Sequence, residues 1–254
     1  MIVKNPTYVK VEVPAPSKFT QFMNGTLTTV TEEDLAGATE IRPYMFYNQP
    51  LLQKVYLPNS VGVIGANAFY NCKKLQQAFI LSPTVSIGNN AFQHSEITKL
   101  IAYGVATKQT NGYCFSDCNK LSYVEFNEGF TTVDSLTTYG TVIKTLVLPS
   151  TTNTLHGNWS QNFSIVKLVC KSLVPPRMAS LGGTNGTNYV PYESIETYKN
   201  ATNWSSYPRF YPLVNSIDDL STIDTSKYVK ACINDRENEY PIYNYTNGEW
   251  VKEA

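Results

Sequence analysis

The chain repeats itself with a period close to 23 residues. Phenylalanine recurs at a constant step, at Phe46, Phe69, Phe92 and Phe115. Isoleucine keeps the same step, at Ile41, Ile64 and Ile87. A fixed period in the low twenties is the signature of a solenoid, in which each unit buries its apolar side against the next unit. The period therefore predicts a stack of coils over this part of the chain.

Each unit contains one short segment in which apolar and polar residues alternate, as they do in a strand. The predicted strands are residues 54–57, 77–80, 99–102, 123–126, 145–148 and 167–170. We expect the last residue of each strand to point into the core: Leu57, Ile80, Ala102, Phe126, Leu148 and Cys170. Strands of successive coils, about 4.8 Å apart, would form one parallel sheet. The predicted fold class is therefore a mainly β repeat solenoid, with turns and short helical pieces.

A short turn motif, Ile-Gly-x-x-Ala-Phe, precedes the earlier strands. We expect its glycine (Gly65 and Gly88) to let the chain bend. The small residue directly before the phenylalanine (Ala68 and Ala91, with Cys114 in the next unit) would admit the neighbouring coil. The phenylalanine would then fill the interior.

These residues resemble a known repeat family. Residues 63–81, VIGANAFYNCKKLQQAFIL, are similar to the BspA-like, or Treponema pallidum-type, leucine-rich repeat. Residues 84–102 follow the same pattern, except that Ser95 takes the place of the cysteine. The resemblance covers about six coils over residues 38–175 and weakens at residues 127–165, where only the strands keep step. It implies a leucine-rich-repeat parallel sheet.

The ends of the chain differ from the repeats, so four segments are predicted. Residues 1–37 form an N-terminal β and loop segment that includes a strand at residues 7–13, residues 38–175 form the repeats, and residues 176–214 form a C-terminal cap. Residues 215–254 form a linker and a small β-meander, which we expect to be a separate module with a hairpin turn at Thr246-Asn247-Gly248.

The charge balance restricts the class of partner. The 20 Lys and Arg residues equal the 20 Asp and Glu residues, and only 16% of the chain is charged. Nucleic acids and anionic membranes attract basic surfaces, so this balance argues against both. No apolar run approaches the roughly 18–20 residues of a membrane span. The sequence thus favours protein partners and leaves a homo-oligomer open.

The sequence offers little for catalysis. Only two histidines are present, His94 and His156, whereas nucleophilic triads and most zinc sites use histidine. One alternative is a metal site at Cys72 and Cys118 with His94. The two cysteines share a phase two coils apart, about 10 Å, which is too far for a disulfide or a shared ion. We therefore favour a row of small buried side chains and predict no catalytic, cofactor-binding or metal-binding residues, and no enzyme.

The candidate binding face is the row of strand residues that should point away from the core. We call it the outer row: Tyr56, Phe79, Ile101, Glu125, Val147 and Val169. Five of the six are apolar, and a contiguous exposed apolar strip usually marks a partner surface. Two alternatives remain. The row reflects the general preference of strands for such residues, or the N-terminal segment folds over it.

The expected function is non-enzymatic binding or assembly. The resemblance implies adhesion, because BspA-like arrays bind host proteins on bacterial and protist surfaces. Similar arrays, opened by a segment like residues 25–48 and closed by one like residues 188–213, are encoded by phages of gut bacteria.

The N-terminal residues favour the virion over the cell surface. Lys4, Lys10 and Glu12 interrupt any apolar signal-peptide core, so if residue 1 is the true start, the usual export route is not used. A virion protein needs no export signal, because lysis releases it. We therefore expect a phage structural protein, located in the virion as part of a tail, fibre or capsid decoration, that binds other virion proteins or a host-surface protein or glycan.

Two other functions stay open. One is a bacterial cell-surface adhesin whose signal lies outside this sequence. The other is a carbohydrate-binding module in which Trp159 or Trp250 stacks on a sugar.

Overall fold

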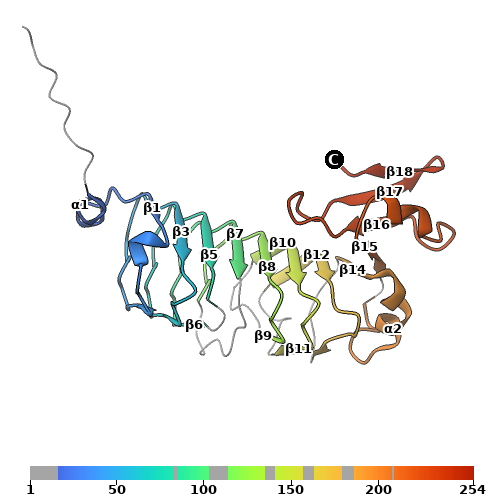
Figure 1. The fold of residues 1–254 in the computed structure, drawn as a ribbon, viewed down its shortest axis with the longest axis horizontal. Coiled ribbons are helices and arrows are strands. Elements are labelled where there is room, and N and C mark those ends of the chain that lie inside the picture. Colours follow the sequence, from blue (N-terminus) through green and yellow to red (C-terminus); the bar gives the residue numbers. More distant parts are fainter. Residues whose placement is uncertain are drawn as a thin grey trace, which may run out of the picture.

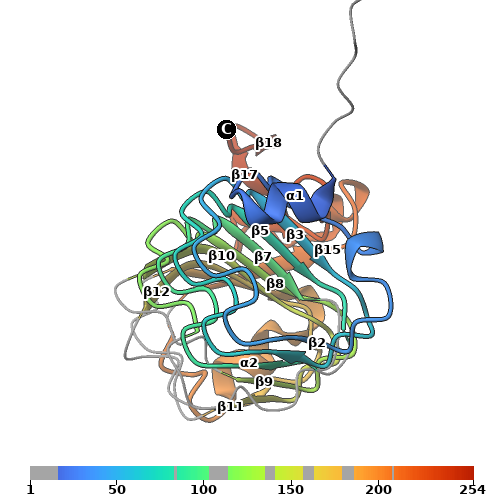
Figure 2. The same cartoon turned by 90° about the vertical axis from the view of Figure 1, so that its left-hand side faces the viewer.

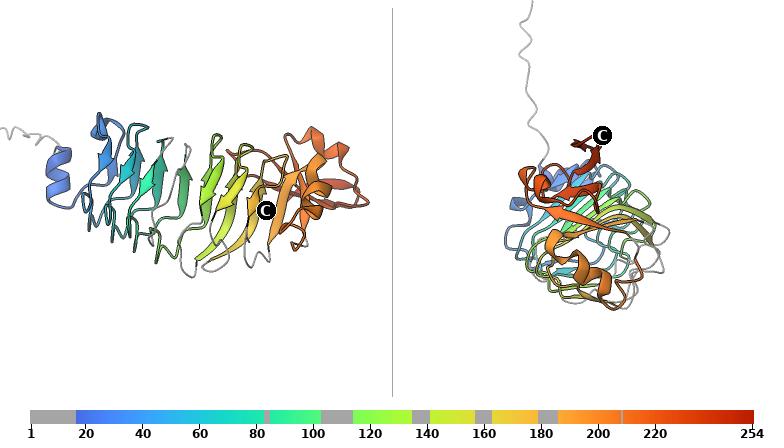
Figure 3. Two further views of the ribbon diagram at one scale, coloured as in Figure 1. Left: turned by 90° about the horizontal axis from the view of Figure 1, so that it is seen from below. Right: turned by 90° about the vertical axis from the view of Figure 1, so that its right-hand side faces the viewer.

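The computed structural model describes residues 17–82, 85–102, 114–134, 141–156, 163–178, 186–207 and 209–254. The strand expected at residues 7–13 lies outside these ranges. The described chain winds into a row of stacked coils, one strand after another along the long axis (Figures 1 and 3). The solenoid prediction is therefore confirmed.

One sheet of 12 strands runs the length of the stack. Its strands, in spatial order, are β1 (Thr29–Val30), β3 (Lys54–Leu57), β5 (Gln77–Ile80), β7 (Lys99–Ala102), β8 (Tyr123–Phe126), β10 (Thr141–Leu148), β12 (Phe163–Cys170), β14 (Thr187–Pro191), β15 (Phe210–Val214), β16 (Lys230–Ile233), β17 (Ile242–Thr246) and β18 (Glu249–Lys252). Pairing is parallel from β1 to β16 and antiparallel from there to β18. All six strands predicted from the sequence lie in this sheet.

Two small parallel sheets close the other side of the coils, as the view along the stack shows (Figure 2). One contains β2 (Glu40–Ile41), β4 (Val63–Ile64) and β6 (Ser86–Ile87); the other contains β9 (Thr132–Asp134), β11 (Thr154–His156) and β13 (Arg177–Met178). The last residues of the six predicted strands all point into the space between the layers and are at most 7% exposed.

The recurring phenylalanines form a continuous row inside the coils. The rings of Phe46, Phe69, Phe92 and Phe115 stack almost parallel, with centroids 5.1, 5.0 and 5.1 Å apart. Each ring is buried. The 23-residue step therefore has a direct cause, because each coil must place its ring against the ring of the coil before it.

The glycine of the turn motif has a different role from the one expected. Gly65 and Gly88 are not among the described glycines with positive φ. A Cβ on Gly88 would instead lie 2.6 Å from the backbone nitrogen of Ala66 in the preceding coil. Asn67 and Asn90, both with φ of 57°, make the left-handed bend. The glycine is needed for close approach of the coils, and the asparagine is needed for the turn.

Both ends of the stack are closed by short helices. At the N-terminal end, α1 (Lys18–Met23) places the ring of Phe22 edge-on against Phe46, and η1 (Glu33–Leu35) follows β1. At the other end, η2 (Tyr192–Ser194) and α2 (Ile195–Asn200) bury Tyr198, whose ring meets that of Trp204. The indole nitrogen of Trp204 donates to the carbonyl of Pro176 at 2.8 Å.

The C-terminal segment continues the main sheet. After η3 (Asp218–Thr222), strand β16 pairs in parallel with β15, and β17 and β18 form a hairpin through Asn247 and Gly248, both with positive φ. The expected meander is thus present, but β16 is hydrogen-bonded to the array and does not stand apart as a separate module. None of the described helices has the length and apolar character needed to cross a bilayer.

Candidate functional site

The outer row lies in register on one face of the main sheet. Tyr56 pairs with Phe79, Phe79 with Ile101, and the register continues through Glu125 and Val147 to Val169. Further pairing extends the same row beyond the predicted repeats, to Tyr189 and Tyr211. The six residues therefore share a face, as expected.

Their exposure does not match the expectation. Ile101 is 6% exposed, Glu125 is 2% exposed, and Val147 and Val169 are fully buried. These four residues are not an exposed strip, so the sequence-based interpretation is wrong for their exposure. Ile101, Val147 and Val169 contribute instead to a second apolar cluster, together with residues from the segment β14 to β17: Tyr189, Leu213, Cys232, Tyr240 and Ile242.

The cover comes from the C-terminal segment. In Figure 1 the red segment that contains β16, β17 and β18 lies over the sheet at its C-terminal end. The residues that link β16 to β17, 234–241, reach back along the sheet; we call them the docked loop. The cover is thus the C-terminal loop and not the N-terminal segment, and no local sequence pattern shows where such a distant loop packs.

Glu125 is the polar centre of this contact. Its carboxylate accepts hydrogen bonds from the hydroxyl of Tyr123 at 2.7 Å and from that of Tyr240 at 3.0 Å. The guanidinium of Arg236 lies 3.1 Å from the same carboxylate. Burial raises the pKa of both tyrosines, and the hydrogen bonds and negative charge of Glu125 raise it further. The buried charge is therefore satisfied entirely by neighbouring side chains, two of them from the docked loop.

Three lysines, two on strands of the sheet and one directly after β12, contact the docked loop. Lys99 makes an ion pair of 2.8 Å with Glu239, and Lys167 donates to the carbonyls of Glu239 and Tyr240 at 3.0 and 3.1 Å. The ammonium of Lys171 lies 5.0 Å from the ring centre of Tyr240. Glu239 and Tyr240 both have positive φ, a conformation that costs energy for residues other than glycine.

The docked loop does not reach the other end of the outer row, and within the described chain that end is only half-buried. Tyr56 and Phe79 are half-buried, and their rings stack at 4.7 Å with an angle of 3° between them. Lys54 and Gln77 lie two positions earlier on the same strands, so their side chains share the outer face. We call these four residues the open patch. Its aromatic pair belongs to the predicted outer row, whereas its two polar members were not predicted from the sequence.

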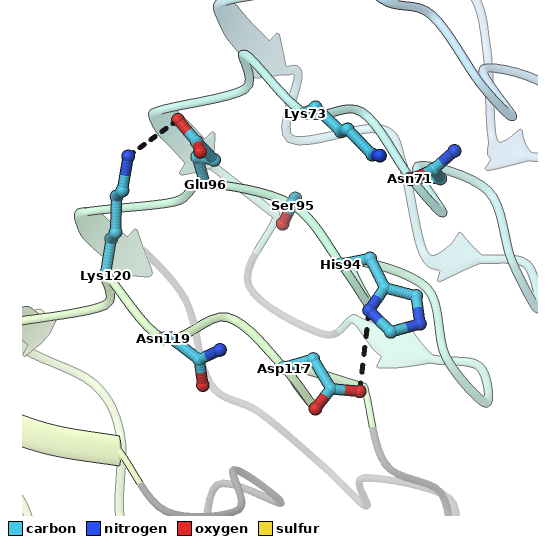
Figure 4. A pocket seen from close by; sticks show the side chains of 8 residues that line it. All are labelled: Asn71, Lys73, His94, Ser95, Glu96, Asp117, Asn119 and Lys120. Carbon is cyan, nitrogen blue, oxygen red and sulfur yellow. Dashed lines mark ion pairs between the residues drawn. The ribbon is translucent and has the colours of Figure 1, made fainter.

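A polar hollow of about 580 Å³ lies on a turn edge of the coils (Figure 4). It brings His94 within 3.5 Å of Asp117 and Glu96 within 2.9 Å of Lys120. Ser95 lies between His94 and Glu96 in the chain, but its buried hydroxyl donates to the carbonyl of Phe92 at 2.6 Å. The one hydroxyl among the described residues that line the hollow is therefore engaged with the backbone and not with His94.

The cysteines of the repeat behave as small buried side chains. The thiols of Cys72 and Cys118 donate to the carbonyls of Phe46 and Phe92, each at 3.0 Å. Burial raises their pKa to about 12 and about 11, which opposes the thiolate that a metal needs. Within the described ranges, no group of three or more metal-binding side chains is present.

The two tryptophans considered for sugar stacking differ in position. Trp159 lies outside the described residues. Trp250 is partly buried, packs against the main core and lies 5.3 Å from the ring of Tyr245. Trp250 therefore anchors the C-terminal hairpin.

Comparison with known proteins identifies the repeats. The family model of the BspA type leucine rich repeat region matches six copies over residues 39–166. None of the curated proteins compared with the chain matches it. Leucine-rich-repeat solenoids are typical of non-enzymatic proteins that bind other proteins. The match covers just over half of the sequence and coincides with the stacked coils, so the chain belongs to the BspA-type leucine-rich repeat family.

Proposed function

We propose that this protein is a non-enzymatic binding protein whose open patch contacts a protein partner. One observation carries the proposal. Tyr56 and Phe79 form a stacked aromatic pair that is half-exposed, on a sheet face whose other half is covered by the chain itself. Aromatic side chains on a rigid strand lose little conformational entropy on binding and are enriched at the centres of protein interfaces.

The coil architecture supports this proposal. A stack of coils fixes many strand residues in one row, which suits recognition of an extended surface. In the polar hollow at His94 the hydroxyl of Ser95 is engaged by the carbonyl of Phe92, and burial raises the pKa of the Cys72 and Cys118 thiols, so none of these three groups is activated as a nucleophile.

The test introduces negative charges in two matched double variants. Tyr56→Glu with Phe79→Glu alters the open patch. Val142→Glu with Val166→Glu places the same charges at residues that are 52% and 50% exposed elsewhere on the coils. Retention of the protein by the particle or cell fraction from which it comes should fall for the first pair and stay unchanged for the second. Equal retention of both variants, with similar thermal midpoints, would refute the proposal.

We further propose that the setting is a virion, in which the protein serves as a tail, fibre or capsid-decoration component. The support is the resemblance of the opening and closing segments, residues 25–48 and 188–213, to arrays encoded by phages. A cell-surface adhesin is the second candidate, supported by the surface role of the family. Mass spectrometry of purified particles and of host envelopes separates the two. Finding the chain only in envelopes would end the virion proposal.

A further inference from the structure

The covered half of the sheet shows how this face is bound by a protein segment. The docked loop places the carboxylate of Glu239 on Lys99 and the ring of Tyr240 against the outer row. Backbone carbonyls of the same two residues accept hydrogen bonds from Lys167. The face thus recognises an acidic residue followed by an aromatic one.

The open patch continues this arrangement without interruption. Strand register places Lys54, Gln77 and Lys99 in one row, beside the row of Tyr56, Phe79 and Ile101. Phe79 packs against the cluster that the docked loop covers, so the open patch begins where the docked loop ends. A partner seated on it would extend an interface that is already formed.

The polar groups of the open patch are without partners in the part of the chain that the structure describes. Lys54 is exposed, and no described carboxylate lies within ion-pair distance of it. The hydroxyl of Tyr56 and the amide of Gln77 also have no hydrogen bond to a described residue. An ammonium group beside two stacked rings favours a ligand that brings a negative charge next to an apolar surface.

We propose that the open patch binds a segment of another protein that carries a carboxylate next to an aromatic side chain, as the chain's own Glu239 and Tyr240 do on the covered half. This inference rests on the proposed function and adds the chemistry of the partner. The docked loop of a second copy cannot supply the segment while it is held in its own chain by Glu125, Lys99 and Lys167. The bound segment is therefore not the docked loop of a second copy and comes from another protein.

A random peptide library selected against the full-length protein tests this chemistry without knowledge of the natural partner. We expect the selected peptides to carry Asp or Glu beside Tyr, Phe or Trp. Their affinity should fall about tenfold or more for Lys54→Glu, a loss of about 1.4 kcal/mol. The matched control is Lys74→Glu, an exposed lysine in the turn before β5, which should leave affinity unchanged.

A second variant separates this inference from the proposed function. If the selected peptides lose affinity for Phe79→Glu but carry no acidic residue and ignore Lys54→Glu, the patch binds proteins and the inferred partner chemistry is wrong. If peptides are selected whose affinity depends on neither Phe79 nor Lys54, or if no peptide is selected, both proposals fall. Circular dichroism of each variant confirms that loss of affinity is not loss of folding.

Discussion

Replacing Glu125 with leucine tests whether this buried carboxylate fastens the docked loop to the sheet. The side chain is 2% exposed and accepts hydrogen bonds from two buried tyrosine hydroxyls, those of Tyr123 and Tyr240. Hydrogen bonds to a charged group contribute about 1.5–3 kcal/mol each, and removing one partner of a buried ionic contact costs about 3–5 kcal/mol. The side chain of Arg236 is 39% exposed, so water replaces part of its interaction. We expect Glu125→Leu to lower the free energy of unfolding by about 3–5 kcal/mol.

Most of this cost should come from the two hydroxyls that lose their acceptor. The triple variant that adds Tyr123→Phe and Tyr240→Phe removes those hydroxyls and should recover about 2 kcal/mol or more. Glu237→Leu, an exposed glutamate on the same loop, is the matched control and should change stability by less than about 0.5 kcal/mol.

The assay must resolve the two halves of the stack, because long repeat arrays do not always unfold in one step. Urea unfolding gives the total change, and hydrogen exchange over residues 230–252 reports the C-terminal segment. Loss of protection there, with the N-terminal coils unaffected, is the expected result. A cost below about 1 kcal/mol for Glu125→Leu, or a triple variant no more stable than the single one, would refute the role assigned to the carboxylate.

Three further predictions follow from the core and the buried tyrosines. Phe92→Ala should cost about 3–5 kcal/mol in urea unfolding, because it empties a fully buried site between two stacked rings; a cost typical of a surface change would contradict the stacked row. Gly88→Ala should lower the thermal midpoint strongly, since the added Cβ meets backbone of the preceding coil at 2.6 Å; an unchanged midpoint would show that the coils can separate freely. The pKa values of Tyr123 and Tyr240 are raised, so the folded state holds their protons more tightly than the unfolded state does. The stability that these protonated hydroxyls contribute is complete below the ordinary pKa of 10.0 and is lost as pH rises through the higher folded pKa. Alkaline unfolding curves should therefore become flatter when both tyrosines are replaced by phenylalanine, and identical curves would contradict the assignment.

The sequence predicts the coils well because their period is a packing requirement. Phe69 and Phe92 recur at a fixed step because each ring must meet its neighbour. Apolar and polar residues alternate along the strands that end at Leu57 and Ile80 because one face of each strand is buried. These constraints act within one unit or between adjacent units, so they are visible in a single sequence.

The sequence predicts the candidate site only in part, because the cover over the outer row is a long-range contact. Glu125 and Tyr240 are 115 positions apart, and nothing near either residue marks the other. The same is true of Lys99 and Glu239, 140 positions apart. Glu125 does stand out as the one charged residue in an apolar row, and that exception was the available signal of a buried polar contact.

The way the docked loop spans the coils alters how the molecule should respond to force. In a plain solenoid each coil touches only its neighbours, so pulling on one end peels coils away one at a time. Here Glu239 links Lys99 on β7 to Lys167 on β12, which ties the intervening strands together. Tension applied at the C-terminus first unpairs β18 and β17 and then has to break that clamp, after which several coils are released together. Tension applied at the N-terminus meets no comparable clamp before β7 within the described chain.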